Sequence, residues 1–302
     1  MNTPRPTDAI VTPKRPLGAS ANIPPRPVDF RQHHPTRKYW LDGSPFKTSF
    51  VATLSALFPE GETFFVKSVR HYRKRIQNPL LQAQVAGFIG QESLHMREHQ
   101  AINALFQAQG FPVRRVDRDV GRLLRLGHKV LPRRVQLAIT VALEHYTAIL
   151  GEQLLRDDDI QARMDPDSRA LWLWHALEET EHKTVAYDVL EQVAPGYALR
   201  VGTMIPVTAL FLGLTAYFHL RLLAADGKLL NLRDNIEGLN YLAGPRGIVP
   251  RLLPAWLDFF KPGFHPSQHD TEALVAAWRE RLFGGEGLLR EQWQNSHGRS
   301  AH

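Results

Sequence analysis

Residues 174–183 read WHALEETEHK, and this short stretch decides the fold of the chain. It is rich in good helix formers and contains neither Gly nor Pro, so we expect it to be helical. Glu179 and His182 are three residues apart, a spacing that places both side chains on one helix face. The stretch is therefore either a solvated helix surface or a set of ligands turned toward the protein interior.

The same Glu-x-x-His spacing occurs earlier in the chain, at Glu92 and His95. Each pair is preceded by a lone glutamate in apolar surroundings: Glu62 in the run ETFF, and Glu144 in the run AITVALEHYTAIL. One pair alone is typical of a solvated helix face. The order Glu, Glu-x-x-His, Glu, Glu-x-x-His, however, is the ligand order of the ferritin-like di-metal carboxylate bundles. The sequence therefore predicts a site for two metal ions.

The charges in this pattern also favour metal binding. Four carboxylates would offset the four positive charges of two divalent ions, so the cluster would be nearly neutral and would tolerate burial. Without metal, the same buried carboxylates would repel one another and their pKa values would rise.

Three further residues lie on the same helical stripes. His175 lies four residues before Glu179 and is expected to be a seventh ligand, whereas His99 is expected to hold a ligand in place. Glu178 is the alternative to Glu179 as a ligand, because it lies four residues before His182. Like His99, it is also a candidate for holding a ligand in place. We expect the metal ligands to be Glu62, Glu92, His95, Glu144, His175, Glu179 and His182.

Composition limits the alternatives. The chain has 302 residues, 43% of them hydrophobic, which is enough for a sizeable core. It has no cysteine, which excludes disulfides, thiolate metal sites, iron-sulfur clusters and cysteine nucleophiles. The formal net charge of +7 indicates attraction to an anionic partner. No Gly-x-Ser-x-Gly sequence is present, so a serine nucleophile on a sharp turn is not expected.

Apolar residues recur at helical spacing from Trp40 onward, which predicts an all-α protein. We expect a ferritin-like four-helix bundle with a C-terminal helical extension. The four bundle helices are expected over residues 61–76, after Pro59, and over 79–110, 133–155 and 167–193.

The expected organisation has three parts. Residues 1–39 form a Pro-rich basic tail that we expect to be disordered, 40–195 the bundle, and 196–302 the extension. No secretory segment is recognisable, so the default location is the cytoplasm, with contact to the periphery of the inner membrane left open. Residues 253–270 are expected to form a loop with aromatic anchors, followed by a short helix after Asp270.

The extension begins with an apolar segment, residues 201–223, which Pro206 interrupts. Its length is at the lower limit for a helix that spans a membrane. We favour a helix that packs over the bundle or enters the membrane interface, with basic residues near anionic headgroups. In either case the segment indicates a lipophilic substrate.

Several stretches carry a resemblance to a known family. The chain resembles the bacterial family of predicted metal-dependent hydrolases in FPEGETFF, GFIGQESLHMREH, ALEHYTAIL, WHALEETEHK and KPGFHPSQHD. The stretch HALEETEH also resembles the His-x-x-x-Glu-x-x-His helix of the di-iron arylamine N-oxygenases, in which the added histidine is a metal ligand. This second resemblance implies that His175 is a ligand, and it implies no particular substrate.

Three functions are compatible with these features. We favour an enzyme in which two metal ions, iron before manganese or zinc, activate dioxygen to oxidise or oxygenate a lipophilic substrate, with electrons from an unidentified donor. The alternatives are a hydrolase with a metal-bound hydroxide, and a non-catalytic metal-binding or membrane-associated protein. A homodimer is left open. Nucleic acid is not an expected partner, because the basic residues of 114–129 alternate with leucines as on a surface helix.

Overall fold

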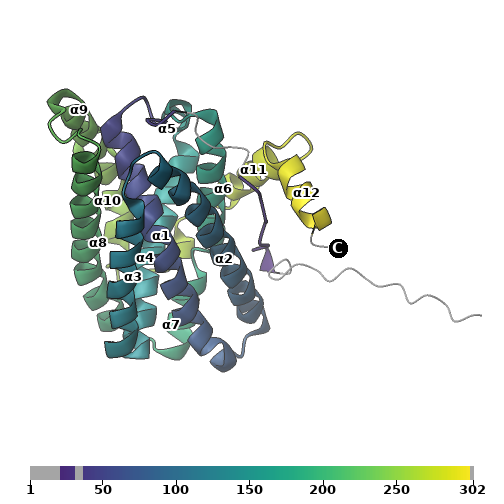
Figure 1. The fold of residues 1–302 in the computed structure, drawn as a ribbon. Helices are drawn as coiled ribbons and strands as arrows, with labels where there is room; N and C mark the ends of the chain where they lie inside the picture. The colour runs from purple at the N-terminus through teal and green to yellow at the C-terminus, as the bar shows by residue number, and fades with distance from the viewer. Residues whose placement is uncertain (1–20, 31–36, 300–302) are drawn as a thin grey trace, which may run out of the picture.

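The computed structural model describes residues 21–30 and 37–299, apart from the side chains of residues 167 and 297–299. Within these ranges the chain is helical, and its only extended pairing is an isolated bridge between Leu41 and Met164 (Figure 1). The expected all-α fold is therefore confirmed. The helices are α1 (Pro45–Tyr72), α2 (Pro79–Ala108), α3 (Val113–Val130), α4 (Arg133–Arg156), α5 (Asp158–Arg163), α6 (Pro166–His182), α7 (Val185–Val193), α8 (Tyr197–Ala225), α9 (Leu232–Ala243), α10 (Ile248–Asp258), α11 (Glu272–Phe283) and α12 (Arg290–Arg299).

Four long helices, α1, α2, α4 and α6, pack around a common interior, while α3 and α8 lie against the outer side of α1 and α4 (Figure 1). Helix α2 starts where the sequence indicates, because the Asn78 side chain accepts a hydrogen bond from the Leu80 backbone N–H and Pro79 occupies the first turn. Gly110, with a φ of 97°, follows its end.

Helix α1 is longer than expected, since it begins at Pro45 and contains Pro59 in its interior. A proline has no backbone N–H, so the carbonyl of Ser55, four residues earlier, loses its helical donor. The Nδ2 atom of Asn103, on α2, donates to that carbonyl at 2.9 Å. This contact replaces the missing bond, and it explains why Pro59 does not begin the helix.

The helix expected over residues 167–193 is divided into α6 and α7 at Lys183 and Thr184. At this break the Lys183 ammonium donates to the backbone carbonyl of His269 and to the Thr271 hydroxyl, which precedes α11. The interruption therefore joins the bundle to the C-terminal helices.

Residues 21–30 begin with a short turn and continue without regular secondary structure, but they are packed, which corrects the expectation of disorder for this part of the tail. Residues 1–20 and 31–36 lie outside the described residues. The segment runs so close to α2 that a Cβ atom on Gly90 would lie 2.3 Å from the Pro25 side chain. Its buried side chains include Ile23, Arg26, Val28 and Phe30.

Helix α8 covers the expected apolar segment 201–223 and packs on α1 and α4 through Met204, Phe218 and Leu222, among others. It is the one helix in the described part of the chain that is long and apolar enough to cross a membrane. The loop expected at 253–270 is wrong at its start, because the residues up to Asp258 belong to α10; α11 begins after Asp270, as expected.

Candidate metal centre

The structure brings all seven expected ligands together in the interior of the bundle. Glu62 comes from α1, Glu92 and His95 from α2, Glu144 from α4, and the other three from α6, and every one of them is buried. Their ligand atoms form two groups, and within each group these atoms lie within 4.8 Å of one another. The first group is Glu62, His95 and His175; the second is Glu92, Glu144, Glu179 and His182.

Glu179 connects the two groups. Its Oε1 atom lies 2.9 Å from His175 Nε2 and 3.3 Å from His95 Nδ1. Its Oε2 atom lies 3.3 Å from His182 Nε2, which is also 3.2 Å from an oxygen of Glu92. One carboxylate thus has an oxygen facing each group, which is the arrangement needed to bridge two ions.

Many of the inward-facing atoms have no hydrogen-bond partner within the described part of the chain. Buried polar atoms without partners are costly, so a concentration of them in one place requires an explanation. Cations bound between these oxygen and nitrogen donors would satisfy them, and this donor set suits iron, manganese or zinc. The atoms are both carboxylate oxygens of Glu62, Glu92 and Glu144, with Glu179 Oε2, His95 Nδ1 and His182 Nε2. The residues present therefore fit a metal centre.

Protons occupy the cluster when no ion is bound. Burial, followed by the charge of Glu92, raises the pKa of Glu62 well above its usual range and that of Glu144 to about 8. Burial also opposes ionisation of Glu179, but the charge of His182 holds its pKa well below the usual range. The pKa of His182 is raised well above its usual value, because the attraction of Glu179 outweighs burial. Metal binding must therefore release protons.

We expect metal to raise the melting temperature more at about pH 8 than at about pH 5.5, because the metal-free fold holds protons that the unfolded chain releases. Glu144 has a folded pKa of about 8 against an ordinary 4.5, so it lowers the free energy of unfolding as the pH rises between these values. His182, with its raised pKa, acts in the same direction above its ordinary value of 6.5. Bound metal removes both effects. Thermal unfolding with and without chelator across this range measures the difference, and a constant difference would contradict the prediction.

A hydrogen-bonded chain behind His175 fixes which of its nitrogens faces the ligands. The Ser55 hydroxyl donates to Asn103 Oδ1 at 2.8 Å, so it accepts from His99 Nδ1 at 2.9 Å. His99 Nε2 then accepts from His175 Nδ1, which lies 2.6 Å away. Burial holds the pKa of His99 well below its usual value, in agreement with a neutral ring. The lone pair of His175 Nε2 is consequently directed toward Glu179.

His95 has a comparable support. Its Nε2 atom donates to Glu178 Oε2 at 3.1 Å, which leaves Nδ1 to face the cluster. Glu178 in turn accepts from the buried guanidinium of Arg26 at 3.2 Å. Of the two candidates, Glu179 therefore faces the ligands, while Glu178 lies behind His95.

His182 is supported by residues that the sequence pattern did not indicate. Its Nδ1 atom donates to Gln91 Oε1 at 3.0 Å, and Gln91 Nε2 donates to Glu181 at 2.9 Å. Glu181 also accepts from Arg26 at 2.7 and 2.8 Å and from Arg279, on α11, at 2.5 Å. The only available signal was the position of Gln91 next to Glu92. Arg26 lies in the stretch that was expected to be a tail, so its sequence position gave no indication of this role.

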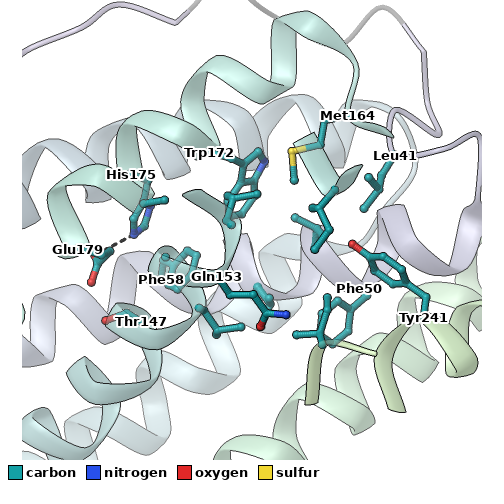
Figure 2. Close-up of a pocket in the computed structure, with 18 residues that line it drawn as sticks. Leu41, Phe50, Phe58, Thr147, Gln153, Met164, Trp172, His175, Glu179 and Tyr241 are labelled. Atoms are coloured by element: carbon teal, nitrogen blue, oxygen red, sulfur yellow. Dashed lines mark hydrogen bonds and ion pairs between the residues drawn. The ribbon is translucent and has the colours of Figure 1, made fainter. Parts of the chain in front are cut away.

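Two apolar cavities lie beside the centre. The smaller, of about 120 Å³, is lined by His175 and Glu179 together with side chains such as Phe58 and Trp172 (Figure 2). The larger, of about 460 Å³, lies between α1, α3, α4 and α8. The cavities share four lining residues, Leu54, Phe58, Thr147 and Leu150. A molecule in the larger cavity is therefore separated from the metal ligands only by this shared wall and the smaller cavity.

Two further histidines, His265 and His269, lie outside the centre, in the segment before α11. His265 Nε2 is 2.8 Å from Asp188, and His269 Nε2 is 3.0 Å from Asp258. Each is thus held by a single carboxylate, in keeping with the loop role expected for this region.

Comparison with known proteins gives one match. The model of a family described as "Predicted metal-dependent hydrolase" matches residues 24–270, which include every candidate ligand. No curated protein and no solved structure matches the chain.

Proposed function

We propose that this chain, which belongs to the family of predicted metal-dependent hydrolases, uses a two-metal centre to cleave an ester, amide or phosphoester bond of a lipophilic substrate. The observation that carries the proposal is the position of Glu179, whose two oxygens face the two groups of ligands. The sequence pattern favoured oxidation, but the family description gives better support to hydrolysis. Ions bound here would supply an acidified water and polarise the bond to be cleaved.

The seven ligands can be assigned to two ions. One ion would lie among Glu62, His95 and His175, and the other among Glu92, Glu144 and His182, with Glu179 between them. The four carboxylates offset the charge of two divalent ions, so the loaded centre would be close to neutral. His99 and Gln91 keep the imidazoles in the tautomers that ligation needs.

The cavities support a lipophilic substrate. Phe58, Trp172 and Leu150 line the approach to His175 and Glu179, and such walls favour an alkyl, acyl or aromatic group. Thr147, Gln153 and Tyr241 are among the few polar side chains in this cavity, and they are available to orient the polar part of the substrate. The apolar part would extend past Phe58 into the larger cavity.

A second candidate function is oxygen-dependent oxidation of the same class of substrate. The observation that favours it is His175, whose Nε2 atom lies 2.9 Å from Glu179 Oε1 and adds a third imidazole to a carboxylate-rich set that suits iron. This function also requires an electron donor.

Metal analysis and turnover assays separate the two. Protein purified without chelator would be analysed for iron, manganese and zinc, then reduced without oxygen and exposed to oxygen under optical monitoring. Its hydrolysis of chromogenic esters with acyl chains of increasing length would be assayed in parallel. We expect bound metal and metal-dependent cleavage that improves with chain length. An iron pair that reacts with oxygen, without ester cleavage, would replace hydrolysis by oxidation, and a protein that binds no metal would overturn both.

A further inference from the structure

The exposed side of α8 is apolar over most of its length. Between Gly202 and Leu220 every exposed residue of the helix is uncharged, and Ile205, Leu212 and Tyr217 are each at least half exposed. Only 28% of its most apolar window is buried in the protein. A helix on the surface of a soluble protein normally presents polar residues to water. An apolar surface of this kind marks an interaction site.

The two helices that follow extend this surface. In α9 the exposed residues Leu232, Ile236 and Leu239 follow at spacings of four and three, and in α10 exposed leucines and a valine follow at spacings of four. Each set therefore lies on one helix face. Helices α8, α9 and α10 lie on the same side of the molecule, at the left of Figure 1. Trp256 of α10 donates to Thr208 of α8 at 3.3 Å, which holds two of them together.

The neighbouring helix α3 is strongly basic. It contains six lysine and arginine residues against two aspartates. Arg118 and Arg122 are paired with Asp119, and Arg125 with Glu60 of α1, but the excess of basic residues leaves the helix with a net positive charge. Leu126 and Val130 are exposed among these basic residues. Basic residues next to exposed apolar ones are complementary to a bilayer that contains anionic lipids.

The larger cavity opens on the same surface. Its lining includes Leu123 of α3 and both Pro206 and Leu210 of α8, and all three are exposed. At its inner end it shares Phe58 and Leu150 with the cavity beside the metal ligands. The side chains between this surface and the cavity beside the metal ligands are therefore mostly apolar.

We infer that the surface formed by α3 and α8 docks on an anionic lipid bilayer, and that a substrate dissolved in the bilayer enters the larger cavity between Leu123 and Leu210. The docking follows from exposed apolar residues and charge alone. The entry of substrate rests on the proposed function. Bilayer binding and catalysis are therefore measured separately.

The test uses the full metal-loaded chain and a matched pair of double variants. Leu212→Ser with Leu220→Ser alters exposed α8 residues that do not line either cavity, with exposed fractions of 50% and 53%. Leu80→Ser with Leu288→Ser alters equally exposed residues, at 55% and 49%, outside α3 and the α8–α10 surface. Co-sedimentation with phosphatidylglycerol-containing vesicles at low and high salt measures docking, and phosphatidylcholine vesicles provide the uncharged comparison. Metal content and turnover of a water-soluble ester show whether the metal centre is intact in each variant.

We expect the wild-type protein and the control variant to bind anionic vesicles, and binding to fall at high salt and with phosphatidylcholine. The α8 variant should bind at least about tenfold more weakly, since two leucines no longer enter the bilayer. Its metal content and turnover of the soluble ester should be unchanged.

Absence of wild-type binding, or equal binding by the two variants, would overturn the docking. So would a dimer in light scattering that the α8 variant dissociates, because a second copy of the chain would then cover this surface. If neither the wild-type protein nor either variant hydrolyses the ester, although the wild type binds the vesicles, the proposed function would be rejected and the docking would stand.

Discussion

Glu179→Gln is expected to reduce bound metal from about two ions per chain to fewer than about one, because this single carboxylate faces both groups of ligands. The amide removes a negative charge and one oxygen donor at the position shared by the two ions. The other ligands remain, but three carboxylates no longer offset two divalent cations. Turnover should be lost together with the metal.

The measurement is metal content after reconstitution, with the melting temperature as a check of folding. Glu191→Gln is the matched control, since Glu191 is an exposed residue of the neighbouring helix α7. A Glu179→Gln protein that retains two ions would show that Glu179 is not a bridging ligand.

Arg26→Met is expected to lower the free energy of unfolding by about 3–5 kcal/mol, the usual effect of removing one partner from a buried ion pair. The Arg26 side chain is 5% exposed and hydrogen-bonds to both Glu178 and Glu181. Without it, Glu178 remains buried against His95 with no cation behind it. A chain of this size should lose on the order of 10 °C in melting temperature.

The matched control is Arg279→Met, which removes the other arginine from Glu181. Arg279 is 27% exposed, so water replaces part of its contact and the expected loss is smaller. Thermal unfolding of both variants, with metal content measured in parallel, gives the comparison. Equal losses would mean that the deeper burial of Arg26 has no particular role.

The ligand positions were predictable because they depend on local geometry. A helix fixes the relative directions of residues three and four apart, so the Glu-x-x-His pairs and His175 face one way wherever the helix packs. The order of these pairs along the chain then indicates a bundle. For the same reason α2 and α4 lie close to their expected ranges, since both are strongly periodic and end at recognisable signals.

Features that depend on distant contacts were missed. Pro59 looked like a helix start, and only Asn103, on another helix, makes it tolerable inside α1. Residues 21–30 have no helical or strand periodicity, and their burial follows from contacts such as that between Arg26 and Glu181, 155 residues away. The break between α6 and α7 likewise coincides with Lys183 reaching residues near α11. The local sequence around each of these positions does not indicate which distant residues will contact it.

The attachment of Glu181 to both Arg26 and Arg279 has a consequence for biosynthesis. The two arginines lie 155 residues before and 98 residues after Glu181, and both contact its carboxylate. A ribosome releases the chain from its N-terminus, so all seven ligands have emerged while Arg279 is still to be translated. The support behind His182 is therefore completed only near the end of translation, and a nascent chain interrupted before α11 would present the ligands without that support. We therefore expect the complete hydrogen-bonded support of His182 to form only after α11 has been synthesised.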